Sequence, residues 1–228
     1  MAQAKHGSWL EGNLTETLVE TLHVDRFKLL RGGDPRLIVA EAEAAADAIE
    51  ARIGEPSGTL AAAEREALMA AQRLCFNAAA DRWPGWEEAS QWPAPTRAEL
   101  HRGLALARRS SALVHRLDLG PLREGTSHWM IGACHLALGE TDDALAAFSL
   151  AVSRYQSAPA PGPARLAQGY IAIAYEAAAR ARPDGVASFE EAQAALAAGG
   201  FEDAAAWGKQ LDVARRVFVG DGSPFRTR

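Results

Sequence analysis

The sequence has few of the features that mark membrane, secreted or metal-binding proteins. Its two cysteines, Cys75 and Cys134, lie far apart and belong to no C-x-x-C or cysteine–histidine ligand pattern. Isolated thiols of this kind are typical of a reducing compartment, where each is expected to be a small buried residue. No apolar run is long enough to cross a bilayer, and the first residues lack the apolar core of a secretory signal. We therefore expect a soluble, cytoplasmic protein.

Strong positive charge and the common catalytic motifs are also missing. The net charge of -5 disfavours non-specific nucleic-acid binding, which requires a basic surface. There is no phosphate-binding glycine loop, H-E-x-x-H motif, nucleophile elbow or EF-hand loop. The sequence thus predicts no catalytic residue, no metal site, no cofactor, and neither nucleic acid nor membrane as a partner.

β-branched residues are sparse, whereas alanine dominates most segments. Because alanine loses no side-chain entropy in a helix, the chain is expected to be all-α. Capping boxes mark helix starts at Asn13/Glu16, Thr96/Glu99 and Ser188/Glu191. With glycines as stops, the predicted helices are 13–31, 35–53, 59–82, 97–118, 122–138, 141–156, 164–182, 188–198 and 201–218. The prolines of 157–164 predict an extended spacer between two of these helices.

These helices predict one domain over residues 1–220, followed by a flexible tail at 221–228. Residues of about 13–82 form its N-terminal helices, and residues of about 97–218 form its C-terminal hairpins. A loose repeat lies in the second part: HLALGETDDALAAF (135–148) returns as ALAAGGFEDAAAW (195–207). In both copies a helix ends at glycine and Asp-Ala opens the next helix, which indicates stacked helical hairpins.

The segment HWMIGACHLALGETDDALAAFSLAV (128–152) resembles a tetratricopeptide repeat (TPR). Its matches are Ile131-Gly132 on the Leu-Gly pair, His135 in the tyrosine slot, Gly139 at the end of the first helix, and Ala144 and Phe148 on A-x-x-x-F. A more degenerate unit follows, with Ile171, Tyr175, Ala192 and Leu196. The resemblance implies antiparallel helical hairpins stacked as a TPR-like α-solenoid, or α-α superhelix. It also implies a non-catalytic scaffold whose concave face binds a protein or peptide.

One side of the predicted helix 97–118 is almost wholly basic. Its residues form two stripes at helical spacing: Arg97, His101, Arg108 and His115 in one, and Arg102, Arg109 and Arg116 in the other. Stacked arginines repel one another, so an acidic neighbour is expected. One hypothesis is an acidic partner segment bound by Arg97, His101, Arg102, Arg108, Arg109 and His115. The alternative is the chain's own helix 35–53, with Glu41, Glu43, Asp47 and Glu50.

The segment DRWPGWEEASQWPAP (81–95) holds half of the six tryptophans. One hypothesis is that Trp83, Trp86 and Trp92 pin the flanking helices together by covering apolar surface. The alternative is a small-molecule pocket lined by the same three residues, in a sensor or an enzyme. Convergence of the rings on a cavity with polar groups would indicate the pocket.

Two histidines, His128 and His135, lie seven residues apart with Cys134 beside them in sequence. Because a third ligand at metal spacing is missing, we expect packing roles for them. The pairs Glu87-Glu88 and Asp142-Asp143 lie near predicted helix starts, where carboxylates complement the helix dipole. Self-association is left open by the sequence.

Overall fold

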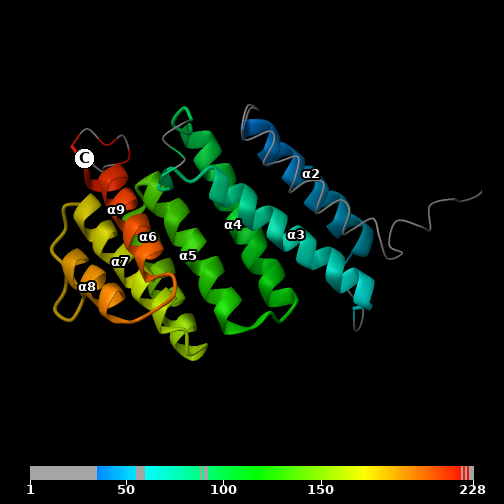
Figure 1. The fold of residues 1–228 in the computed structure, drawn as a ribbon. Helices are drawn as coiled ribbons and strands as arrows, with labels where there is room; N and C mark the ends of the chain where they lie inside the picture. Colours follow the sequence, from blue (N-terminus) through cyan, green and yellow to red (C-terminus); the bar gives the residue numbers. More distant parts are fainter. Residues whose placement is uncertain are drawn as a thin grey trace, which may run out of the picture.

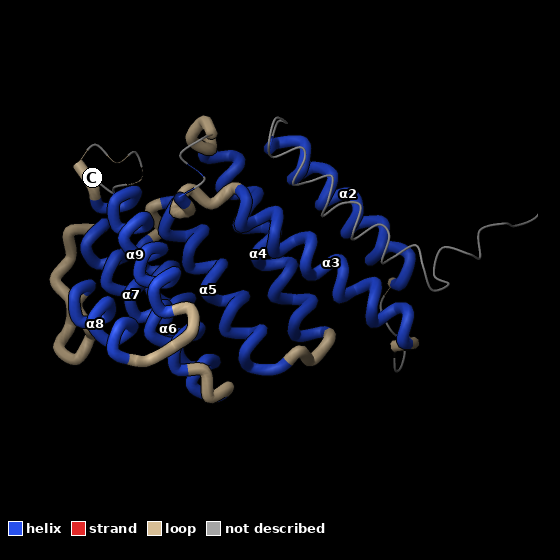
Figure 2. Tube along the Cα trace, in the orientation of Figure 1, coloured by secondary structure: helices blue, strands red, loops and turns tan. Residues whose placement is uncertain are grey.

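The computed structural model describes residues 35–54, 60–87, 89, 92–221, 223 and 225. Every regular element within these ranges is a helix (Figures 1 and 2). The helices are α2 (Pro35–Ile53), α3 (Ala62–Asp81), α4 (Arg97–Arg116), α5 (Gly120–Leu138), α6 (Thr141–Ser157), α7 (Pro161–Ala177), α8 (Phe189–Ala198) and α9 (Ala204–Val219). The predicted helix 13–31, the Asn13 cap and most of the tail 221–228 lie outside the described residues.

Two of the predicted capping boxes open helices as expected. The Thr96 hydroxyl accepts from the Glu99 backbone N–H, and the Glu99 carboxylate accepts from the Thr96 backbone N–H, at the start of α4. Ser188 and Glu191 make the same reciprocal pair at the start of α8. Gly139 ends α5 at φ 75°, a left-handed conformation that glycine adopts without steric cost.

The extended spacer predicted at 157–164 is wrong. Helix α6 continues to Ser157 and α7 already begins at Pro161, because proline is tolerated in a first helical turn. Helix α7 also ends earlier than predicted, at Ala177. There the Arg180 N–H donates to the Tyr175 carbonyl across Ala179, which has a φ of 50°. This is a Schellman-type end without a glycine to signal it.

Each helix packs against the next along the chain, from α2 to α9 (Figure 1). Further contacts join α3 with α5, α5 with α7, and α7 with α9. The odd-numbered helices therefore form one layer, and α2, α4 and α6 lie on its other side. The predicted all-α fold of stacked helical hairpins is confirmed for the described residues.

The core is built from small side chains that bring helices close together. Gly132 of α5 faces the ring of Phe148 on α6, and a Cβ at Gly132 would lie 2.7–3.0 Å from that ring. Phe148 is fully buried and stacks on Tyr170 of α7 at 5.3 Å between ring centroids. The pair proposed from the sequence, Gly132 and Phe148, thus lies at the centre of the α5–α6–α7 contact. None of the described helices is long and apolar enough to span a membrane.

Candidate functional site

One edge of the basic side of α4 faces α2. Three arginines pair with that helix: Arg102 with Glu43 (3.0 Å), Arg109 with Asp47 (2.7 Å) and Glu50 (2.6 Å), and Arg116 with the Gly54 carbonyl (2.6 Å). Two of the predicted partner-binding residues, Arg102 and Arg109, are thus engaged inside the chain, as the second hypothesis for this helix expected. The side chain of Glu41 lies outside the described set.

The other edge of α4 faces α5 and solvent. Arg97 and His101 are exposed, and no ion pair to either is found among the described residues. Arg108 and His115 reach α5, where Arg108 Nη2 lies 3.3 Å from His135 Nε2 and His115 Nδ1 lies 3.6 Å from a Glu124 oxygen. Because α4 belongs to the layer of α2 and α6, this edge does not continue along the first helix of the TPR-like unit, as the sequence suggested. It continues onto the polar side of α5.

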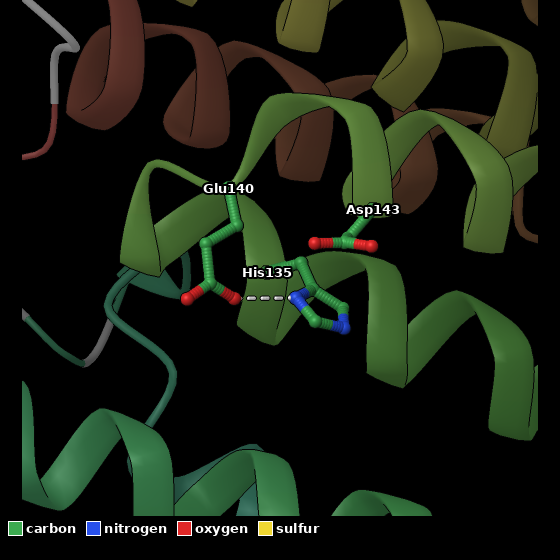
Figure 3. Close-up of side chains that lie close together, drawn as sticks. All are labelled: His135, Glu140 and Asp143. Atoms are coloured by element: carbon green, nitrogen blue, oxygen red, sulfur yellow. Dashed lines mark hydrogen bonds and ion pairs between the residues drawn. The ribbon is translucent and has the colours of Figure 1, made fainter.

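His135 is the centre of a polar cluster at the α5–α6 turn (Figure 3). Its Nδ1 lies 2.7 Å from Glu140 Oε2, and its side chain is only 5% exposed. An arginine can only donate, so Nε2 must accept from Arg108 and Nδ1 must carry the proton donated to Glu140. The cluster therefore links α4, α5 and the start of α6 through one neutral imidazole.

The same cluster has three potential metal ligands. One ligand atom each from His135, Glu140 and Asp143 lies within 4.8 Å of the others (Figure 3). A metal on Nδ1 would require the proton on Nε2, yet that nitrogen faces the guanidinium of Arg108. The nearby cation also opposes a second positive charge. The donor arrangement thus favours a hydrogen-bonded network that holds the hairpin turn.

A second polar cluster lies farther along α5. Glu124 pairs with His115 of α4 and with Arg154 of α6, whose Nε lies 3.0 Å from a carboxylate oxygen. The ring of His128 lies 6.3 Å from that of His115. Burial lowers the pKa of His128, and the positive charges of His115 and Arg154 lower it further, against the opposing effect of Glu124.

A lowered histidine pKa predicts a loss of stability in acid. In the unfolded chain His128 takes up its proton near its ordinary value of 6.5, whereas the folded chain resists protonation until lower pH. Between these two values the unfolded state binds more protons, so stability falls as the pH falls. We expect His128→Gln to lose fewer degrees of Tm than the wild type between about pH 7.5 and about pH 5.5 in thermal melts. Equal losses in both proteins would contradict this role of His128.

The two cysteines are poor nucleophiles and poor metal ligands. Both are free and buried, and burial raises the pKa of each thiol to about 12. Metal binding and nucleophilic attack require the thiolate, which is scarce at neutral pH in such a site. The role in packing predicted for Cys134 fits this environment.

The tryptophan-rich connection between α3 and α4 is held against the core by its first indole. Trp83 is 1% exposed, and its Nε1 donates to the Ala133 carbonyl of α5 at 2.9 Å. Its ring also contacts Tyr170 of α7 and Phe218 of α9. Trp86 packs on Trp83 at 5.0 Å between centroids and donates to the Ala80 carbonyl. This arrangement is what the pinning hypothesis expects of these two residues.

The same connection also borders a cavity of about 420 Å³. All three predicted residues line it: Trp83, Trp86 and the half-buried Trp92. The opposite wall is formed by the last turns of α9, with Val213, Arg216 and Val217, and by Phe225. The three rings thus converge on a cavity with polar groups at its wall, which is the feature expected of the pocket hypothesis.

Several residues of these sites were not predicted from the sequence. Glu140 and Asp143 follow His135 across a glycine turn, and the hairpin itself returns them over the end of α5. That signal was available in the sequence. The pairing of Glu124 with Arg154 and the α9 wall of the cavity depend on packing between distant segments, for which the sequence pattern gives no signal. No family model, curated protein or solved structure matches the chain.

Proposed function

We propose that this protein is a non-catalytic, TPR-like scaffold in the cytoplasm that binds an acidic segment of a protein or peptide partner. The observation that carries the proposal is the division of labour on α4. The stripe of Arg102, Arg109 and Arg116 is engaged with α2 or its end, whereas Arg97 and His101 of the other stripe are exposed. The chain itself therefore supplies acidic partners to one stripe and leaves much of the other to solvent.

The geometry of this edge suits an extended acidic segment. Arg97 and His115 are separated by 18 positions, which is about 27 Å along a helix, and Arg108 lies between them. Arg154 of α6 and Leu150, which is 48% exposed, extend the surface onto the neighbouring helix. Aspartate or glutamate side chains could pair with the arginines in a bidentate manner. A nucleic acid fits less well, because Glu124, Glu140 and Asp143 interrupt the positive charge.

Charge reversal on this edge tests the proposal directly. We expect a fluorescein-labelled, Glu/Asp-rich peptide to bind the wild-type chain more weakly as salt rises from about 50 to about 300 mM, since exposed charges are screened over this range. Replacing both Arg97 and Arg108 by glutamate should weaken binding in fluorescence anisotropy by at least about tenfold. The melting temperature should change by only about 2 °C, because both side chains are exposed.

A matched control is available on α3. Arg65 and Arg73 are also exposed arginines, and they lie on a different helix. The Arg65→Glu/Arg73→Glu variant should bind the peptide nearly as well as the wild type. Equal weakening by the two double variants would show that net charge alone governs binding, and the proposed face would be wrong.

A further inference from the structure

The cavity beside the tryptophan-rich connection has the size of a small-ligand site. Its volume of about 420 Å³ lies within the usual range for such sites, about 300–1,000 Å³. The connection after α3 and the end of α9 lie at the same end of the molecule and form its two walls (Figure 1). Because these walls come from distant parts of the sequence, the cavity exists only in the folded chain.

Most of the lining is apolar and much of it is flat. Trp86 and Trp92 are half-buried, so each covers part of the core and still presents surface to the cavity. Pro84 and Pro95 lie beside them in the connection, and Val213 and Val217 face them from α9. Indole faces bind flat apolar groups by stacking, with offset or edge-on geometry.

The polar groups at the wall favour a negative ligand. Arg82 lines the cavity and is only 8% exposed; its Nη2 pairs with Glu99, but its buried Nε has no hydrogen-bond partner among the described residues. Arg216, which is exposed, adds a second guanidinium from α9. A buried N–H without a partner is costly, so an acceptor placed here would be stabilising.

The two acidic residues at the wall do not offset this charge. Glu87 pairs with Lys209 at 2.6 Å, and Asp81 also has an interaction partner. Both carboxylates are thus engaged. The guanidinium groups of Arg82 and Arg216 are the groups at this wall that suit a carboxylate in charge and in geometry.

We infer that this cavity binds a small organic anion with a flat aromatic body, its carboxylate beside Arg82 and Arg216 and its ring between Trp86 and Trp92. The site is separate from the exposed edge of α4 and does not depend on the proposed partner. A metabolite-sized aromatic acid would therefore bind whether or not the acidic segment is bound by Arg97 and Arg108.

Calorimetry with a simple pair of probes tests this inference on the full chain. We expect 2-naphthoate to bind at least about tenfold more tightly than its neutral analogue 2-naphthamide, and inorganic phosphate, which lacks a ring, to bind weakly. Comparable affinities for the acid and the amide would overturn the role of the arginines. Absence of 2-naphthoate binding at millimolar concentration would overturn the site itself.

Two variants locate the binding. Arg216→Gln should weaken 2-naphthoate by about tenfold and leave 2-naphthamide nearly unchanged, whereas Trp92→Ala should weaken both probes. The matched controls are Arg165→Gln, an exposed arginine on α7, and Trp207→Ala, a half-buried tryptophan packed on Phe201 outside the cavity. Unchanged 2-naphthoate affinity in Arg216→Gln, or equal losses in the controls, would place binding elsewhere. The wild-type comparison of acid with amide decides the matter if Trp92→Ala does not fold.

Discussion

Replacing Trp83 by alanine is expected to lower the free energy of unfolding by about 3–5 kcal/mol, the usual cost of deleting a large aromatic side chain from a core. The indole is 1% exposed and lies within 6 Å, between ring centroids, of Trp86, Trp129, Tyr170 and Phe218. Alanine would leave a cavity among these rings. It would also leave the buried Ala133 carbonyl without the N–H that it receives from Trp83.

Urea denaturation followed by circular dichroism measures this loss. Trp207→Ala serves as the control, because Trp207 is only half-buried and contacts one aromatic ring, that of Phe201, at 6.2 Å. We expect it to cost less than half as much as Trp83→Ala. If Trp83→Ala cost less than about 1 kcal/mol, the connection would not be anchored in the core as described.

Replacing Gly132 by alanine is expected to destabilise the protein by about 1–3 kcal/mol, although alanine is the better helix former. A Cβ at this position would lie 2.7–3.0 Å from the ring of Phe148. That ring is fully buried and stacks on Tyr170, so it cannot move away without disturbing α7. Close packing of α5 on α6 therefore outweighs the gain in helix propensity.

Gly103 of α4 provides the matched control. It is also a buried glycine within a helix, but a Cβ there would lie 3.9 Å from the Ala79 carbonyl oxygen, an ordinary contact distance. Gly103→Ala should therefore raise stability by up to about 1 kcal/mol through helix propensity. Opposite signs in thermal or urea unfolding would support the argument. A stabilised Gly132→Ala variant would refute the close approach of α5 and α6.

Local chemistry explains how much of the fold was predictable. Thr96 with Glu99 and Ser188 with Glu191 are side-chain signals within one helical turn, so the starts of α4 and α8 follow from the sequence. The end of α7 was missed because alanine, rather than glycine, adopts the positive φ at Ala179. The spacer at 157–164 failed for another reason: proline excludes helix interiors but not first turns.

The candidate sites were predictable only in part. Helical spacing placed Arg102 and Arg109 on one stripe, and the acidic composition of 35–53 offered Glu43, Asp47 and Glu50 as partners. Which stripe faces α2 depends on the rotation of α4 about its axis, and packing decides that. The α9 wall of the cavity depends on the path of the whole chain, because more than a hundred residues separate Trp92 from Val213.

The contact of Trp83 with Phe218 also bears on how the chain unfolds. In a linear stack each helix contacts only its neighbours, so distant parts can open separately and folding can start at several places. Here an indole at the end of α3 touches a ring on α9, and the two residues are far apart in sequence. Such a contact couples the two ends of the described stack into one cooperative unit. It also raises the average sequence separation of contacts, which slows folding relative to a purely local array of hairpins.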